Sequence, residues 1–140
     1  MNISTSKLLS LINNSESFEE ATEYHRNHPE PTFPDELAAI MKKKRVTAKE
    51  LIKISGIERS YFYHIMGQKK NPGRNMVLRI AFSIQVSLED TNRLLLLAGH
   101  AKLYSKIFRD AIMIYAIRKK MSIDEVNDLL VSEKQDPLFI

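Results

Sequence analysis

Four polar side chains between Ile57 and Gly67 have types and spacings suited to hydrogen-bond recognition: Arg59, Ser60, Tyr63 and His64. On a helix, separations of one, four and five residues place all four side chains on one face. An arginine on such a face can donate two hydrogen bonds to the edge of a guanine. The segment therefore predicts a surface that contacts base edges of a nucleic acid.

The flanking elements must position this surface. Thr47-Ala48-Lys49-Glu50 has the Ser/Thr-x-x-Glu spacing of a capping box, which predicts the start of a helix. Gly56 follows that helix and can adopt the positive φ that a tight turn requires. The next helix is predicted at about 58–66, with Phe62 and Ile65 three residues apart on its buried side. Two short helices joined through a glycine turn indicate a helix-turn-helix.

The rest of the chain is also predicted to be helical. Apolar residues recur at spacings of three and four, and further helices are predicted at about 7–12, 18–28, 34–45, 74–85, 88–98, 106–120 and from Ser122 onward. Pro29, Pro31 and Pro34 prevent a helix from continuing and mark a boundary. We therefore expect an all-α chain in three parts. These are an N-terminal helical extension (1–32), a helix-turn-helix domain (33–100) and a C-terminal helical extension (101–140) used for packing or dimerisation.

Composition excludes several classes of protein. The chain has 140 residues, the size of one ordinary domain, and its 44% hydrophobic and 27% charged residues exclude wholesale disorder. No apolar run approaches the roughly 20 residues that cross a bilayer, and the first residues do not resemble a secretory signal. Cysteine is absent, which excludes disulfides, thiol nucleophiles and thiolate metal sites. A cytoplasmic protein without a membrane segment is the expectation.

The formal net charge of +4 is unevenly distributed. Residues 33–100 contain 12 lysines and arginines against 6 acidic residues, whereas residues 1–32 contain 2 against 5. A polyanionic partner is therefore expected at the middle of the chain.

The middle of the chain also carries a longer series of motifs. They are Val46-Thr47 through Glu50-Leu51, Gly56-Ile57 with Arg59-Ser60-Tyr61, Ile65, Lys69-Lys70-Asn71-Pro72, and Leu78-x-Ile80-Ala81 through Val86-Ser87-Leu88. With these motifs residues 35–99, about half of the chain, resemble the lambda-repressor-like helix-turn-helix family, which includes Cro and the xenobiotic-response-element regulators. The resemblance implies a bundle of five helices, the third of which enters the major groove of double-stranded DNA. Members usually bind as homodimers on half-sites about 34 Å apart.

The resemblance also implies site residues. By position, Arg59, Ser60 and His64 fall where family members contact bases, with Tyr63 beside them. The positions that usually hold phosphates are occupied by Thr47, Lys49, Lys69, Lys70, Asn71 and Arg74. Lysine, asparagine and helix N-terminal amides are groups that suit phosphate. The prediction is a sequence-specific, repressor-like regulator of transcription.

Two positions depart from the family pattern and support an alternative. Ala48 replaces a common glutamine, and Glu58 places a carboxylate near the start of the helix that would contact bases. Both favour a protein-interaction module that keeps the bundle but no longer binds DNA. Arg59 and the basic loop at 67–73 oppose this alternative.

Catalysis, a metal and a cofactor are not predicted. No Ser/His/Asp arrangement, paired-carboxylate site or phosphate-binding glycine loop is present, so an enzyme is not expected. His25 and His28 have a spacing seen in metal sites, but such sites need three or four ligands. The helix at 106–120 is apolar almost all round, which indicates burial inside the monomer or at a dimer interface.

Overall fold

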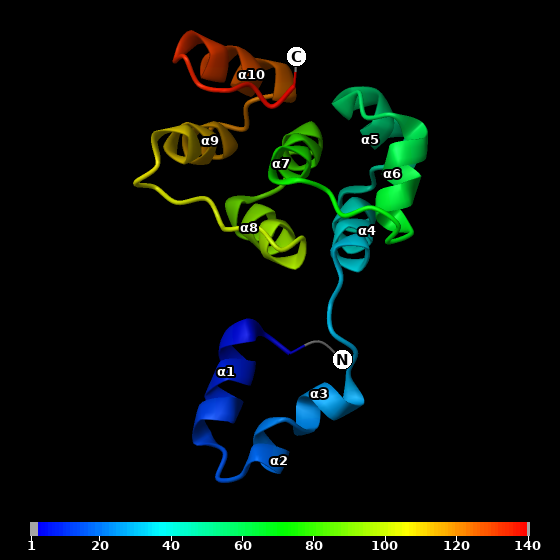
Figure 1. The fold of residues 1–140 in the computed structure, drawn as a ribbon, viewed down its shortest axis with the longest axis vertical. Helices are drawn as coiled ribbons and strands as arrows, with labels where there is room; N and C mark the ends of the chain where they lie inside the picture. Colours follow the sequence, from blue (N-terminus) through cyan, green and yellow to red (C-terminus); the bar gives the residue numbers. More distant parts are fainter. Residues whose placement is uncertain (1–2, 140) are drawn as a thin grey trace. The chain divides into compact units, whose positions relative to one another are not determined.

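The computed structural model describes residues 3–139, which form ten helices and no strand (Figure 1). The prediction of an all-α chain is confirmed. The chain divides into two compact units, the first ending at Pro31 and the second beginning at Thr32. No helix within the described residues is long and apolar enough to cross a membrane.

The first unit consists of three short helices without a buried side chain. They are α1 (Thr5–Asn14), α2 (Phe18–Ala21) and α3 (Glu23–Asn27). The helix predicted at 18–28 is broken at Thr22, whose hydroxyl donates a 2.8 Å hydrogen bond to the Phe18 carbonyl. The same carbonyl also accepts the Thr22 N–H, and the helix breaks here because the Thr22 backbone, with φ of −108° and ψ of 5°, leaves the helical conformation. Leu9 and Phe18 are exposed, so these helices enclose no core.

Within the described residues the second unit contains seven helices around one core. They are α4 (Phe33–Lys44), α5 (Ala48–Ser55), α6 (Arg59–Met66), α7 (Arg74–Ser83), α8 (Leu88–Leu97), α9 (Phe108–Arg118) and α10 (Ile123–Ser132). Helix α7 lies at the centre, in contact with α5, α8 and α10, and α9 packs on α8 and α10 (Figure 1).

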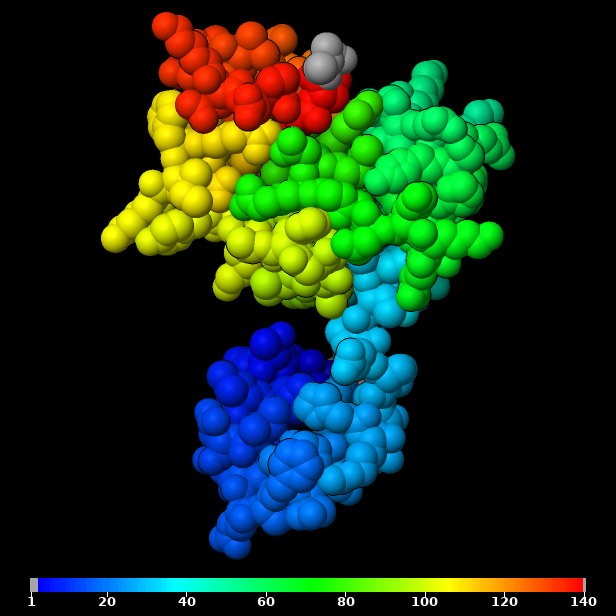
Figure 2. Space-filling model, in the orientation of Figure 1, coloured from blue at the N-terminus to red at the C-terminus, as the bar shows by residue number. Residues whose placement is uncertain are grey.

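The core of this unit runs without interruption from α4 to α10. Its most deeply buried side chains are Leu37, Leu51, Phe62, Ile65, Val77, Leu78, Ile80, Leu94, Leu95, Met113, Val126 and Leu130. Figure 2 shows the red residues of the C-terminal segment packed directly against the green residues of α7. The segments predicted as a DNA-binding domain (33–100) and a C-terminal extension (101–140) therefore share one core.

Local capping signals set where several of these helices begin. The Thr32 hydroxyl accepts a hydrogen bond from the Asp35 N–H at the start of α4, and the Ser87 hydroxyl accepts one from the Asp90 N–H at the start of α8. Helix α10 begins with a complete capping box formed by Ser122 and Glu125. These short-range bonds fix the ends of the helices that surround α7.

Helix α9 is only partly buried, although its sequence is apolar almost all round. Ile112, Met113 and Ala116 face the core, whereas Phe108 and Tyr115 on the other side are more than half exposed. The burial predicted for this helix inside the monomer therefore covers one side.

Candidate nucleic-acid interface

The turn between α5 and α6 is built from short-range bonds. At the start of α5 the Thr47 hydroxyl accepts a 3.1 Å bond from the Glu50 N–H, and the Glu50 carboxylate accepts a 3.2 Å bond from the Thr47 N–H. The helix ends at Gly56, whose φ of 69° is left-handed and whose N–H donates to the Ile52 carbonyl. The capping box and the left-handed glycine predicted from the sequence are confirmed.

Buried side chains determine which face of α6 is outward. Phe62 and Ile65 are each 1% exposed, and Leu51 on α5 and Ile57 in the turn are also buried. Helix α6 packs against α4 through this apolar side. Tyr61 and Met66 beside them also pack partly against the core, so the outward side of α6 is the side opposite these four residues.

All four predicted base-contacting side chains lie on the exposed side of α6: Arg59, Ser60, Tyr63 and His64. The Arg59 guanidinium lies over the Tyr63 ring, 5.7 Å from its centroid, which is within the range of a cation–π contact. This contact restrains the arginine side chain and keeps it on the outer surface. The arrangement exposes an arginine, a phenol and an imidazole on one side of α6, together with the side chain of Ser60.

The Ser60 hydroxyl is not free in this structure. It donates a short hydrogen bond to the carboxylate of Glu58, the residue just before α6. Glu58 makes no capping bond to the backbone of α6. Its carboxylate therefore acts as a local partner for Ser60 and places a negative charge at the start of the proposed base-contacting helix.

The loop after α6 presents two lysines. The backbone N–H groups of Lys69 and Lys70 both donate to the His64 carbonyl, at 2.8 and 3.2 Å, which folds the loop back onto the end of α6. Both lysine side chains are exposed, and neither forms an ion pair with any residue between 3 and 139. Their exposure leaves room for the predicted contacts with phosphate, which stay a prediction.

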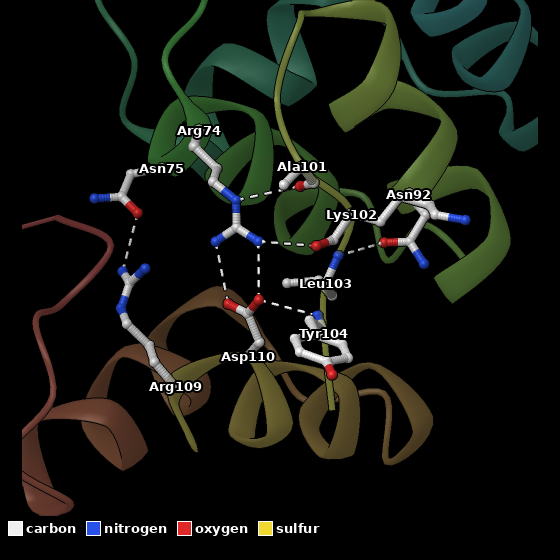
Figure 3. Close-up of polar contacts among 9 residues, drawn as sticks. All are labelled: Arg74, Asn75, Asn92, Ala101, Lys102, Leu103, Tyr104, Arg109 and Asp110. Carbon is white, nitrogen blue, oxygen red and sulfur yellow. Dashed lines mark hydrogen bonds and ion pairs between the residues drawn. The ribbon is translucent and has the colours of Figure 1, made fainter. Parts of the chain in front are cut away.

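Two other predicted phosphate ligands are used inside the protein. The Asn71 amide donates a 2.8 Å bond to the Ala98 carbonyl and holds the loop to the end of α8. The Arg74 guanidinium donates two bonds to the Asp110 carboxylate, at 3.1 and 3.0 Å, and others to the carbonyls of Ala101 and Lys102 (Figure 3). Each guanidinium nitrogen of Arg74 therefore donates to a protein oxygen, and its contact with phosphate stays a prediction.

The remaining two predicted ligands lie at the start of α5. Lys49 is exposed. The Thr47 hydroxyl accepts its capping bond and donates a 2.9 Å bond to the Glu50 carboxylate. Three of the six predicted phosphate ligands, Thr47, Asn71 and Arg74, therefore form side-chain hydrogen bonds within the protein. The other three are exposed lysines: Lys49, Lys69 and Lys70.

Sequence reasoning missed one residue that supports this surface. Arg79 of α7 lies behind the turn, where its Nε donates a 2.7 Å bond to the Ser55 carbonyl. A Cβ atom at Gly56 would lie 3.1 Å from Nη2 of this arginine. No local pattern connects residues 55 and 79, so no sequence signal could have found the contact.

Comparison with protein-family models, with curated proteins and with solved structures finds no match to this chain. Within residues 3–139 no group of three or more histidines and acidic residues is placed to hold a metal ion. The function must therefore be inferred from the surface formed by α5, α6 and the loop that follows.

Proposed function

We propose that this chain is a sequence-specific regulator that binds double-stranded DNA, with α4–α8 arranged as in lambda-repressor-like proteins. One observation carries the proposal: Arg59, Ser60, Tyr63 and His64 share the exposed side of a short helix whose other side is buried. A tight glycine turn precedes that helix, as the major-groove geometry of a helix-turn-helix requires.

The proposed base contacts follow from the chemistry of these side chains. Arg59 donates two hydrogen bonds to the O6 and N7 atoms of a guanine, while Ser60 and His64 bond neighbouring base edges. Tyr63 supports the arginine through the 5.7 Å ring contact. Helix α6 therefore supplies sequence selectivity.

The proposed phosphate contacts come from the three exposed lysines, Lys49, Lys69 and Lys70. Phosphate contacts fix the position of a protein on the duplex and supply affinity that falls with salt. A single short helix contacts few base pairs, so the proposal includes a homodimer on two half-sites about 34 Å apart.

The test is selection of bound sequences from a pool of random duplexes, using the full chain. We expect one enriched motif, and we expect Arg59→Ala to remove the preference at one base pair of it. The matched control is Arg118→Ala, which removes an exposed arginine from the end of α9 and should leave the motif unchanged. Recovery of no enriched motif, even at low salt, would contradict the proposal.

A protein-interaction module is the second candidate, and the bond between Ser60 and Glu58 favours it. The Glu58 carboxylate accepts the hydrogen bond of the Ser60 hydroxyl, which is predicted to contact a base. It also adds a negative charge that would repel the phosphates of an approaching duplex. A mobility-shift assay with non-specific duplex at low salt separates the two candidates. Retardation of the duplex supports the regulator, whereas an unshifted duplex at every protein concentration favours the module.

A further inference from the structure

Arg79 connects the turn of the proposed interface to the C-terminal end of the described chain. Its Nε donates a 2.7 Å bond to the carbonyl of Ser55, the last residue of α5. The carbonyls in the last turn of a helix have no partner within the helix, so a donor from outside is needed. The Ser55 hydroxyl also accepts a bond from the Ile57 N–H, which ties this residue to both sides of the turn.

The same guanidinium contacts Phe139. Its carbon atom lies 4.9 Å from the centroid of the Phe139 ring, closer than the contact between Arg59 and Tyr63. Burial lowers the pKa of the Arg79 guanidinium, so the side chain is partly withdrawn from water where it meets the ring. A cation–π contact is stronger when the cation is desolvated.

Phe139 is itself fixed in place by α10. The Asn127 side-chain oxygen accepts bonds from the N–H groups of Leu138 and Phe139, at 2.7 and 3.3 Å. The Asn127 amide donates a 3.0 Å bond to the Phe139 carbonyl, and the Leu138 side chain is buried. Three hydrogen bonds with Asn127 and the buried Leu138 side chain therefore fix the backbone of residues 138–139 on α10.

We propose that Leu138 and Phe139 form a tail strap that acts through Arg79 to position the turn before α6. Asn127 of α10 hydrogen-bonds the strap, and the Phe139 ring makes a cation–π contact with the Arg79 guanidinium. The guanidinium in turn donates a hydrogen bond to the Ser55 carbonyl. Arg79 and Phe139 are then positioning residues for base contacts that neither touches. The effect on base selectivity rests on the proposed DNA-binding function.

Base and phosphate contacts should respond differently to loss of the strap. Hydrogen bonds to base edges depend on the orientation of α6 because their geometry is narrow. Contacts between lysine side chains and phosphates adapt to small movements because they are electrostatic and made by long flexible side chains. Loss of the strap should therefore reduce selectivity more than overall affinity.

The test variant is Phe139→Ala, and the matched control is Phe108→Ala, which removes an exposed phenylalanine ring at the start of α9. The first measurement is hydrogen exchange of the backbone amides at 55–60, which requires no DNA. We expect Phe139→Ala to speed this exchange roughly 3- to 10-fold, the size expected for loss of one cation–π contact. Phe108→Ala should leave exchange at 55–60 unchanged.

A second variant, Arg79→Met, replaces the apolar stem of the arginine by a side chain of similar length but removes the hydrogen-bond donor and the positive charge. It should speed exchange in the same segment at least as much as Phe139→Ala. The double variant should add little to Arg79→Met alone, because the phenylalanine acts only through the guanidinium. If the increases in exchange rate caused by Arg79→Met and Phe139→Ala were fully additive in the double variant, the proposed strap would be wrong.

The second measurement is the ratio of affinities for the selected DNA site and a non-specific duplex. We expect Phe139→Ala to lower this ratio roughly 3- to 10-fold, while affinity for the non-specific duplex stays within about twofold. The strap is refuted if exchange at 55–60 keeps its wild-type rate, or if exchange rises equally in all helices of the second unit. If exchange responds locally but wild-type protein binds no duplex, the strap stands and the proposed DNA-binding function fails.

Discussion

Arg74 and Asp110 form a two-bond ion pair across 36 positions of sequence, with N–O distances of 3.1 and 3.0 Å. Asp110 is 2% exposed, and its carboxylate also accepts a bond from the Tyr104 N–H. Figure 3 shows the guanidinium reaching the carbonyls of the segment before α9 as well. The ion pair therefore joins the start of α7 to α9. The same guanidinium also fixes the connection between α8 and α9 through its bonds to Ala101 and Lys102.

Arg74→Ala should destabilise the second unit strongly. The substitution leaves a buried carboxylate without its cation, and breaking a buried pair in this way typically costs about 3–5 kcal/mol. Because the Arg74 side chain is 28% exposed, we expect a cost near the lower end, roughly 3 kcal/mol. Urea unfolding followed by circular dichroism measures it. Lys106→Ala, which removes an exposed cation from the same connection, is the control, and an equal loss in both variants would contradict the role of the pair.

Gly56→Ala should also destabilise the second unit, through the backbone. Its φ of 69° is strained for any residue with a Cβ, and that atom would press on Arg79 at 3.1 Å. We expect a loss of about 1–2 kcal/mol in the free energy of unfolding. Gly73→Ser is the matched control because its φ is −68° and a Cβ there meets nothing within 4 Å. A comparable loss for Gly73→Ser would show that strain at residue 56 is not the cause.

The sequence predicted the parts of this fold that depend on short-range chemistry. The capping boxes at Thr47 and Ser122 and the left-handed Gly56 each rest on bonds within a few residues. The exposed side of α6 follows from the same reasoning, because Phe62 and Ile65 fix which face is buried. These signals require no knowledge of what lies across the core.

The sequence did not predict the features that depend on distant residues or on backbone strain. The contacts of Arg74 with Asp110 and of Arg79 with Ser55 join residues more than 20 positions apart. Arg45 at the end of α4 and Lys120, two residues after the end of α9, have the positive φ for which glycine is the usual signal. Packing of the unit imposes these turns in spite of the residue type, so composition and periodicity could not reveal them.

The capping box of α10 should make stability depend on pH. Hydrogen bonds from the backbone N–H of Ser122 and then from its side chain lower the pKa of Glu125 below its ordinary value of 4.5. Since the folded state binds this proton less readily than the unfolded state, the contribution to stability is complete above pH 4.5. It is lost as the pH falls through the lowered pKa.

Glu125→Gln should therefore be less stable than wild type at neutral pH, and the difference should shrink below pH 4.5. Urea unfolding at a series of pH values measures both free energies. Asp128→Asn removes an exposed acid from the same helix outside the box and serves as the control. A difference between wild type and Glu125→Gln that stays constant across this range would contradict the assignment.

Arg59 and Lys70 should differ in how they affect DNA binding. Arg59→Ala is expected to cost roughly 1–3 kcal/mol on the preferred site and to relax selectivity at one base pair. Lys70→Ala should weaken binding to every duplex alike and reduce the salt slope by about one. Titrations of selected and non-specific duplexes at several salt concentrations separate the two effects. If both variants lose affinity equally on all sequences, the proposed division between base and phosphate contacts is wrong.

Glu58→Gln should strengthen DNA binding, because it removes the negative charge at the start of α6 and weakens the bond from the Ser60 hydroxyl. An exposed charge contact is typically worth up to about 1 kcal/mol, so we expect a gain of roughly 0.5–1 kcal/mol on the selected site. Glu133→Gln makes the same change in net charge at an exposed position just after α10 and should not alter affinity. Fluorescence titration of labelled duplex measures the difference. A gain of equal size in both variants would mean that only net charge matters, and the position of Glu58 beside the base-contacting side chains would then have no specific role.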